Sequence, residues 1–400
     1  MKIQLQNTLF YPAIGGIENY LYYVSKTLLK LRHRPIILCS QHQKNVPEED
    51  IYEGVRVIRY PLTPRIIKLF MMFNQFYYEN ELKKFIERNL ENIDIIWARH
   101  PYYAYASCKA LPKKPIIYIQ ATVWPFFLSQ GYNKLNRIHK IMFNIRKPQN
   151  FYLEKQAINM CNQIVVLSKI KMKEISDYYK FSEEKFKIIP PGIDLKRFKA
   201  RNRDSNLLEK LDIDKNAKIV LTVCRLAPGK NVEMLIKAFN KINFANTYLL
   251  IVGNGQEKIY LQQLAKDLNI ANKIIFLGFR TDVERFYSIA DVFVLSSKYE
   301  GFGHVYLEAM ASGVPCIGLR SDYPKVIVAS DEIIIDGETG YCVNPYSIED
   351  LAEKIEKIIS DDDLRQKMGR KSIELCKNKY SWEIHVKELI KLSKDFTKKY

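Results

Sequence analysis

The sequence predicts an α/β protein built from two doubly wound halves, each a parallel β-sheet with helices on its connections. Short runs rich in β-branched residues alternate with helical segments in both halves of the 400-residue chain, and this alternation is typical of parallel sheets with crossover helices. A Pro-Pro-Gly stretch at 190–192 separates the two series and predicts a hinge. A chain of this length is long enough for two domains of ordinary size.

The first series of elements occupies the first half of the chain. It opens with an expected strand at 2–10 and an expected helix at 17–33. Leu21, Val24 and Leu28 of that helix are three or four residues apart, as one buried helical face requires. Further strands are expected at 34–40, 55–60, 93–98, 114–120 and 162–168.

The second series repeats this pattern. Helices are expected at 232–239 and 257–268. Strands are expected at 217–226, 247–255, 272–279, 291–297 and 314–319. Since ligands of such sheets bind beyond the carboxyl ends of the strands, we expect the site in a cleft between the two domains.

Composition narrows the class of protein. Hydrophobic residues make up 47% and charged residues 26% of the chain, which excludes wholesale disorder. No run of eighteen apolar residues indicates a membrane-spanning helix, and the first residues lack a secretory pattern. The seven cysteines are scattered singly, without zinc spacing, so we expect reduced, mostly buried thiols. We therefore expect a cytoplasmic protein, with the inner face of the membrane as the alternative location.

The net charge of +18 favours anionic partners such as nucleic acid, anionic lipid or phosphorylated substrates. Codon bias in a genome rich in Lys, Ile, Asn and Tyr codons explains the same excess equally well. No nucleic-acid-binding module is recognisable in the sequence, so we expect no specific nucleic acid partner.

Two segments of the first half are both basic and apolar. Residues 64–78 are rich in aromatic residues, and residues 134–147 place apolar residues on one helical face with Lys and Arg outside it. Pro148 is expected to end that helix. Such a helix can lie in an anionic membrane interface. The alternative is an ordinary helix that faces the core and leaves its cations in water.

The stretch 298–318, KYEGFGHVYLEAMASGVPCIG, carries the clearest chemistry. Gly301 and Gly303 allow the backbone to approach a ligand closely, and a helix that begins near His304 offers its N–H groups to a phosphate. Glu308, one turn inside that helix, can accept hydrogen bonds from the vicinal hydroxyls of a ribose. Glu300 can reach the hydroxyls of a second sugar. These features indicate a nucleotide-sugar pocket, whereas two ordinary surface glutamates are the alternative.

Here the sequence resembles the GT-B-fold retaining glycosyltransferases of family 4, also called glycosyl transferases group 1. The resemblance covers nearly the whole chain and is strongest from Ile188 to Pro345. It rests on segments 188–198, 223–239, 249–255, 276–279, 286–297, 300–315 and 336–345, in that order. The fold implied is two Rossmann-like doubly wound domains that face a central cleft.

The resemblance also implies the domain organisation and the function. Residues 1–187 would form the acceptor-side domain, 188–380 the nucleotide-sugar-binding domain, and 381–400 a final helix that packs back toward the first domain. The implied activity is transfer of a hexose from a UDP- or GDP-sugar to a glycan or lipid-linked acceptor, with retention of configuration. Neither a metal nor a cofactor is expected, because two cations can stabilise the leaving diphosphate. A catalytically degenerate homologue, or a basic protein that binds nucleic acid or membrane, is the alternative.

Those two cations are Arg225 and Lys230, which the resemblance assigns to the donor diphosphate. It places Glu300 on the transferred sugar and Glu308 on the ribose. Gly15 and Gly16 match the family's glycine loop after the first strand, where a plain tight turn is the alternative. The implied donor-binding set is completed by Gly301, Phe302, Gly303, His304 and Val305.

The sequence departs from the family pattern in the first half. Many members carry a histidine that contacts the transferred sugar, and the matching place here holds Ala121. A neighbouring strand supplies His100, with Arg99 where relatives often have histidine. His100 is therefore a candidate catalytic residue, and a structural or acceptor-side role is its alternative.

Overall fold

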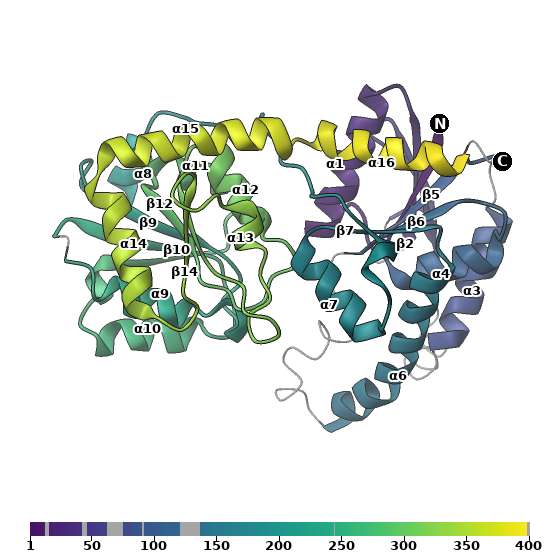
Figure 1. Cartoon of the computed structure of the whole chain (residues 1–400), viewed down its shortest axis with the longest axis horizontal. Coiled ribbons are helices and arrows are strands. Elements are labelled where there is room, and N and C mark those ends of the chain that lie inside the picture. The colour runs from purple at the N-terminus through teal and green to yellow at the C-terminus, as the bar shows by residue number, and fades with distance from the viewer. Residues whose placement is uncertain are drawn as a thin grey trace. The chain divides into compact units, whose positions relative to one another are not determined.

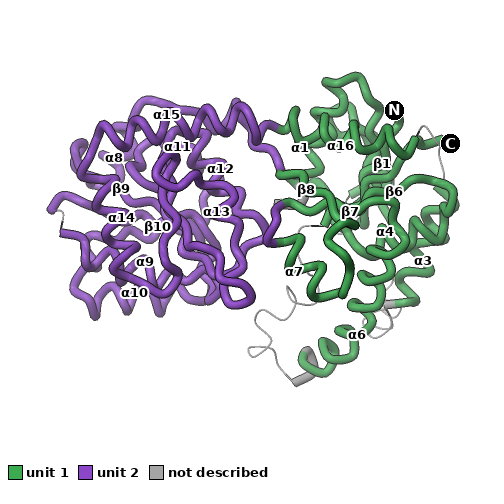
Figure 2. The backbone as a smooth tube through the Cα atoms, in the orientation of Figure 1, with its two compact units in different colours: residues 1–167, 171–190, 382–400 green, residues 168–170, 191–381 purple. Residues whose placement is uncertain are grey.

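The computed structural model describes residues 1–12, 16–41, 46–61, 75–89, 92–120, 137–243 and 245–397. The chain divides into two compact units, coloured separately in Figure 2. Unit 1 comprises residues 1–167, 171–190 and 382–400, and unit 2 comprises residues 168–170 and 191–381. Each unit contains one sheet with helices around it, so both halves have the α/β architecture that the alternating sequence pattern predicts.

The sheet of unit 1 has eight described strands in the order β3-β4-β2-β1-β5-β6-β7-β8. Neighbouring strands are parallel except β3 and β4, which are antiparallel. The strands are β1 (Lys2–Gln6), β2 (Arg34–Ser40), β3 (Glu49–Tyr52), β4 (Val55–Tyr60), β5 (Ile95–Ala98), β6 (Ile116–Gln120), β7 (Gln163–Val166) and β8 (Phe186–Ile188). The edge strand β3 was not among the elements expected from the sequence, because its alternating EDIY pattern is short and mostly polar.

Helices cover both faces of this sheet, as Figure 1 shows. They are α1 (Gly16–Lys30), α3 (Gln75–Arg88), α4 (Pro101–Ala110), α6 (Arg137–Met160), α7 (Lys169–Tyr179) and α16 (Trp382–Thr397), with a short 3₁₀ turn, η2 (Glu183–Lys185). Strand β5 shows how the two faces differ. Ile96 and Ala98 belong to the apolar cluster with α3, α4, α6 and α7, whereas the indole of Trp97 donates to Ser393 of α16 (3.0 Å).

Helix α6 differs from the sequence prediction at Pro148. The proline was expected to end the helix, but α6 continues through it to Met160. Beyond the proline, Leu153, Ala157 and Ile158 are buried in the core of unit 1. We attribute the continuation to this packing, which offsets the loss of one backbone hydrogen bond at the proline.

The sheet of unit 2 has six described strands in the order β11-β10-β9-β12-β13-β14, and all neighbours are parallel. They are β9 (Lys218–Val223), β10 (Thr247–Val252), β11 (Ile274–Gly278), β12 (Val292–Leu295), β13 (Cys316–Leu319) and β14 (Gly340–Val343). Strand β12 is buried along its whole length, as a parallel strand with both faces covered should be.

The helices of unit 2 are packed around this sheet. They are α8 (Ser205–Lys210), α9 (Val232–Phe239), α10 (Lys258–Asp267), α11 (Val283–Ile289), α12 (His304–Ala311), α13 (Ser330–Ile333), α14 (Ile348–Ser360) and α15 (Asp362–Lys379), with short 3₁₀ turns at η3 (Pro228–Lys230) and η4 (Ala271–Lys273). The apolar faces of α9, α10 and α14, with Met368 of α15, form the second core cluster together with residues of β9 to β14.

Each sheet has one point where the chain reverses the direction in which it adds strands. In unit 1, β2 lies on one side of β1 and β5 on the other. In unit 2, β10 lies on one side of β9 and β12 on the other. The loops that leave the two central strands at such a point diverge, and ligands of open α/β sheets bind there, beyond the carboxyl ends of the strands.

Candidate functional site

The loop after β9 carries two of the predicted site residues at the switch point of unit 2. The backbone N–H of Leu226 donates to Asn254 in the loop after β10 (3.0 Å), and the backbone N–H of Lys230 donates to Ala227 (2.8 Å). Asn231 then adopts a left-handed conformation (φ 52°), which turns the chain into α9. Arg225 is exposed, and its guanidinium has no hydrogen-bond or ion-pair partner within the part of the chain that the structure describes.

The loop after β12 is held directly against this first loop. The backbone N–H of Lys298 donates to Gly229 (2.9 Å), and the hydroxyl of Ser296 donates to the carbonyl of Asn231 (2.9 Å). On its other side, the backbone N–H of Glu300 donates to Ile327 (2.9 Å). These hydrogen bonds fix the backbone of the loop at Glu300 and so determine where the Glu300 side chain begins.

Lys230 and Glu300 meet between the two loops and form an ion pair. Their side chains are 20% and 14% exposed, respectively. The Ser297 hydroxyl also donates to Glu300 Oε1 (2.9 Å). The two loops therefore bring one predicted cation and one predicted carboxylate together, in a position that remains partly open to solvent.

The glycine-rich segment 301–305 leads from this pair into α12. Gly303 has φ 91° and immediately precedes the helix, whose first residue is His304. A Cβ at Gly303 would lie 2.8 Å from Cδ2 of Tyr306, so a larger residue would displace that ring. His304 and Val305 are half-buried, whereas Phe302 is buried and its ring lies edge-on to Tyr380.

Glu308 lies on α12, one turn after its start, and is half-buried. The hydroxyl of Tyr287, from α11, donates to Glu308 Oε2 (2.9 Å). Burial raises the pKa of Glu308 to about 6, and the hydrogen bond from Tyr287 opposes part of that rise. The carboxylate is thus held by one donor and keeps acceptor sites for a ligand's hydroxyls.

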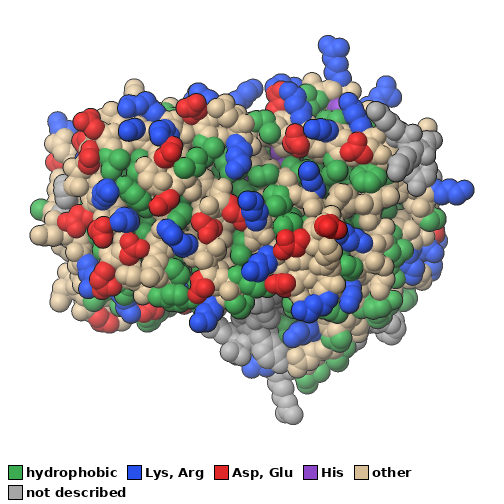
Figure 3. Space-filling model, in the orientation of Figure 1, with side chains coloured by type: hydrophobic (Ala, Val, Ile, Leu, Met, Phe, Trp, Pro, Cys, Tyr) green, Lys and Arg blue, Asp and Glu red, His purple; other side chains and the backbone are tan. Residues whose placement is uncertain are grey.

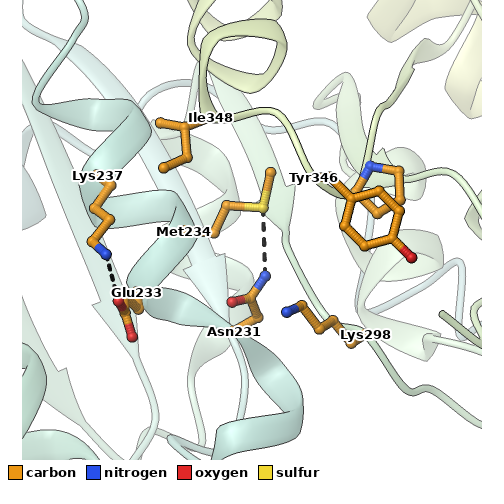
Figure 4. Close-up of a pocket in the computed structure, with 8 residues that line it drawn as sticks. Asn231, Glu233, Met234, Lys237, Lys298, Tyr346 and Ile348 are labelled. Carbon is orange, nitrogen blue, oxygen red and sulfur yellow. Dashed lines mark hydrogen bonds and ion pairs between the residues drawn. The ribbon is translucent and has the colours of Figure 1, made fainter. Parts of the chain in front are cut away.

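A pocket of about 340 Å³ opens beside the two loops, between α9 and the start of α14 (Figure 4). Lys298 projects toward Asn231 and Met234, and the amide of Asn231 donates to the sulfur of Met234 (3.4 Å). The pocket is lined by Asn231, Glu233, Met234, Lys237, Lys298, Pro345, Tyr346 and Ile348. None of these residues was predicted as a site residue, because nothing in their spacing distinguishes them from an ordinary helix face and loop.

Comparison with known proteins identifies the family. A sequence model described as Glycosyltransferase Family 4 matches residues 14–197, and one described as Glycosyl transferases group 1 matches residues 204–375. The N-acetyl-alpha-D-glucosaminyl L-malate synthase of Bacillus anthracis is 30% identical over 291 residues, which cover 71% of this chain and 70% of that protein. The chain belongs to glycosyltransferase family 4.

Other relatives of this family 4 glycosyltransferase match along the whole chain. An uncharacterized glycosyltransferase of Methanocaldococcus jannaschii is 27% identical over 409 residues, covering 98% of each chain. Among solved structures, sucrose-phosphate synthase from Thermosynechococcus elongatus superimposes with a TM-score of 0.79 at 20% identity, covering 100% of both chains. The Anabaena protein HepE in complex with UDP gives a TM-score of 0.77 at 20% identity, covering 99% of this chain and 100% of HepE. The predicted GT-B fold is confirmed.

The predicted residues of unit 1 are placed differently from those of unit 2. His100 is 5% exposed, and its Nδ1 accepts from the backbone N–H of Tyr102 (3.3 Å) at the start of α4. Burial lowers the pKa of His100 to about 3, so the imidazole is neutral at physiological pH. This is the position of a helix cap, and the catalytic role of His100 stays a prediction. Gly16 begins α1, whereas Gly15 and Ala121 lie outside the described residues.

Two contributors to the site were missed by sequence reasoning. Tyr287, which donates to Glu308, is 21 residues away from it in the sequence. Ser297 donates to Glu300, which also pairs with Lys230, 70 residues before Glu300. Ser297 follows a buried strand and precedes Glu300 by three residues. Because ligands of open α/β sheets bind beyond the carboxyl ends of the strands, this position alone marks Ser297 as a candidate site residue. Tyr287 is recognisable only once α11 and α12 are placed side by side.

The described residues contain no group of three or more His, Cys, Asp or Glu side chains arranged to hold a metal ion. Among the same residues, no helix has the length and apolar character needed to cross a membrane. On the face that Figure 3 shows, Lys and Arg side chains of the coloured residues are scattered among Asp and Glu over both units, with no single basic patch.

Proposed function

We propose that this glycosyltransferase moves a hexose from a UDP- or GDP-sugar to a glycan or lipid-linked acceptor, with retention of anomeric configuration. The observation that carries the proposal is the Lys230–Glu300 pair at the switch point of unit 2, with Arg225 in the same loop, whose guanidinium has no partner among the described residues. A diphosphate bound there would meet two cations, while Glu300 would become available to sugar hydroxyls.

The proposed reaction breaks the bond between the anomeric carbon and the diphosphate oxygen. The acceptor hydroxyl attacks that carbon from the same face, and its proton passes to the departing phosphate oxygen. Negative charge therefore grows on the leaving group in the transition state. Arg225 and Lys230 would stabilise that charge, which is the kind of preorganised electrostatic contribution that dominates many enzymatic rate enhancements.

Glu300 and Glu308 would then bind different parts of the donor. Glu308, oriented by Tyr287, would accept hydrogen bonds from the ribose hydroxyls. Glu300, oriented by Ser297, would accept from hydroxyls of the transferred hexose. The donor-binding set would include Gly15 and Gly16 from unit 1 and residues 301–305 from unit 2, which contribute mainly backbone groups.

A kinetic comparison of two variants separates these roles. Glu308→Ala should weaken nucleotide binding because the ribose loses its acceptor. Glu300→Ala should lower kcat more than it weakens nucleotide binding, because the hexose is positioned less well. If both variants retained wild-type kinetics, neither assignment would stand.

Retention and independence from metal are tested together. Donor and acceptor panels should be incubated with the enzyme in the presence of excess EDTA, and the product followed by NMR. The proposal predicts undiminished turnover and a product with the anomeric configuration of the donor. An inverted product, or loss of turnover that Mg²⁺ or Mn²⁺ restores, would contradict it.

We also propose peripheral association of unit 1 with anionic membranes, where a lipid-linked acceptor would be found. On α6, Ile141 is 51% and Ile145 39% exposed, and Lys147 is exposed on the same helix. Exposed apolar residues beside cations suit a membrane interface. Co-sedimentation with anionic vesicles at low salt should fall for Ile141→Glu and not for Ile259→Glu, a matched change at an 82% exposed isoleucine of unit 2.

A further inference from the structure

Unit 1 has a switch point of its own, between β1 and β5. Strand β5 ends at Ala98, so Arg99 is the first residue beyond the carboxyl end of that strand. Its backbone N–H donates to the carbonyl of Gln6 at the end of β1 (2.8 Å), which fixes Arg99 between the two strands. By the same rule that locates the donor site in unit 2, a ligand of unit 1 is expected at this place.

The guanidinium of Arg99 is incompletely paired. Its Nε and Nη1 atoms are buried and have no hydrogen-bond partner among the described residues. Within the described part of the chain, no carboxylate forms an ion pair with it. Buried donors without acceptors cost free energy, and a buried charge without a counter-ion costs more. An arginine kept in this state is therefore a candidate for pairing with an anion that is not part of the chain.

The surroundings hold the guanidinium in a defined orientation. Its Cζ lies 4.0 Å from the centre of the Tyr20 ring. The Tyr20 hydroxyl bonds to Nε2 of His385 (2.6 Å), and Nδ1 of His385 bonds to the carbonyl of Pro190 (2.7 Å). The contact with Tyr20 offsets part of the buried charge, but Nε and Nη1 still have no acceptor among the described residues. The cation is thus positioned before any ligand binds, which lowers the entropic cost of binding.

A second unpaired group lies at the same edge of the sheet. Gln120, the last residue of β6, is 1% exposed and donates through Nε2 to Glu154 (2.6 Å). Its Oε1 has no partner among the described residues. Gln120 bonds to α6 on one face of the sheet, whereas Arg99 stacks on Tyr20 of α1 on the other face, so the case for a bound anion rests on Arg99.

We propose that Arg99 binds a phosphate or carboxylate group of the acceptor substrate. This inference rests on the proposed function and names the chemical class of its second substrate. The planar guanidinium can donate two parallel hydrogen bonds to either oxyanion. Each unit then receives one substrate at its own switch point: the nucleotide sugar in unit 2, and the anionic acceptor in unit 1.

The test measures binding of inorganic phosphate by calorimetry, with a saturating nucleoside diphosphate present to occupy unit 2. Arg99→Gln should weaken phosphate binding on the order of 10- to 100-fold, the loss expected when a hydrogen-bonded charge is removed. The affinity for the nucleoside diphosphate should stay unchanged. Arg225→Gln is the matched control. It should lower the affinity for the nucleoside diphosphate, and the affinity for inorganic phosphate should stay unchanged once the nucleotide site is saturated.

Each outcome decides a separate question. Phosphate binding that is unchanged in Arg99→Gln, or absent from the wild type at millimolar concentration, overturns the role of Arg99. Absence of any nucleotide binding by the wild type overturns the proposed function instead. If Arg99→Gln does not fold, Arg99→Lys keeps the charge and loses the planar fork, so phosphate binding should be weakened but measurable. Wild-type phosphate affinity in Arg99→Lys, with a lowered Tm, would indicate a purely structural arginine.

The source of the anion is distinguished by turnover assays. A sugar phosphate, a dicarboxylate and a short-chain polyprenyl diphosphate are offered as acceptors or competitors, each beside a neutral analogue. Arg99→Gln should raise KM for the acidic compound that reacts and leave KM for a neutral acceptor unchanged. An equal rise for both would show that Arg99 does not recognise the anion.

Discussion

Lys230 and Glu300, 70 residues apart in the sequence, form an ion pair where the loops after β9 and β12 meet. Glu300 is thus paired with the ammonium group that we assign to the donor diphosphate. A bound diphosphate would exchange partners with Glu300 and release it toward the transferred sugar. We therefore propose that this ion pair changes partners when the donor binds.

Replacement of Lys230 tests this arrangement. Lys230→Met removes one of two cations at the leaving group, and we expect kcat/KM to fall about 10²- to 10³-fold, as for other losses of one preorganised charge-stabilising donor. Lys371→Met is the matched control, because it removes a 2.8 Å ion pair with Glu338 on a surface that the site does not use. Equal activities of the two variants would show that Lys230 does not act at the leaving group.

Glu308 makes stability depend on pH in a defined direction. Its folded-state pKa of about 6 exceeds the ordinary value of 4.5, so its contribution to stability is complete below pH 4.5 and is lost as pH rises through 6. Glu308→Gln lacks this titration. The free energy of unfolding of the variant should therefore exceed that of the wild type by about 1–2 kcal/mol at pH 8, and the difference should vanish near pH 4. Denaturant titrations at both pH values measure it, and a difference that does not change with pH would contradict the burial of Glu308.

Position 303 requires glycine for two reasons: its backbone has a positive φ, and the Tyr306 ring leaves no room for a side chain. Gly303→Ala forces a side chain into φ 91° and against the Tyr306 ring, and we expect a loss of roughly 2 kcal/mol or more in stability, with weaker nucleotide binding as the start of α12 shifts. Gly337→Ala is the control, since Gly337 has φ 75° with nothing within 4 Å of the new Cβ. Thermal denaturation of the two variants separates backbone strain from the clash with Tyr306. Identical losses would mean that the ring yields without cost.

His100→Asn distinguishes a helix cap from a catalytic group. The folded-state pKa of about 3 lies below the ordinary 6.5, so the contribution of His100 to stability is complete above pH 6.5 and declines as the pH falls toward 3. Wild-type stability should therefore fall more steeply than that of His100→Asn between pH 6.5 and 4. Since Asn also caps helices well, turnover at pH 7 should be largely retained. A loss of turnover of 10²-fold or more would support the predicted catalytic role.

Much of the fold could be read from local sequence patterns. The strands at 34–40 and 55–60 were predicted with the bounds they have, because continuous β-branched runs between turns leave little choice. The antiparallel edge strand β3 and the continuation of α6 through Pro148 could not be predicted, since both depend on tertiary packing rather than on local propensity. The same reason explains why the pairing of Lys230 with Glu300 and the support of Glu308 by Tyr287 were invisible in the sequence.

The central claim is that Arg225 and Lys230 bind the diphosphate of a nucleotide-sugar donor. Calorimetric titration of UDP and GDP into the wild type and into Arg225→Gln, Lys230→Met and Lys371→Met tests it most directly. We predict that one of the two nucleotides binds the wild type and Lys371→Met equally, and that each site variant loses on the order of tenfold or more in affinity. Unchanged affinity in both site variants, or no binding of either nucleotide to the wild type, would contradict the claim.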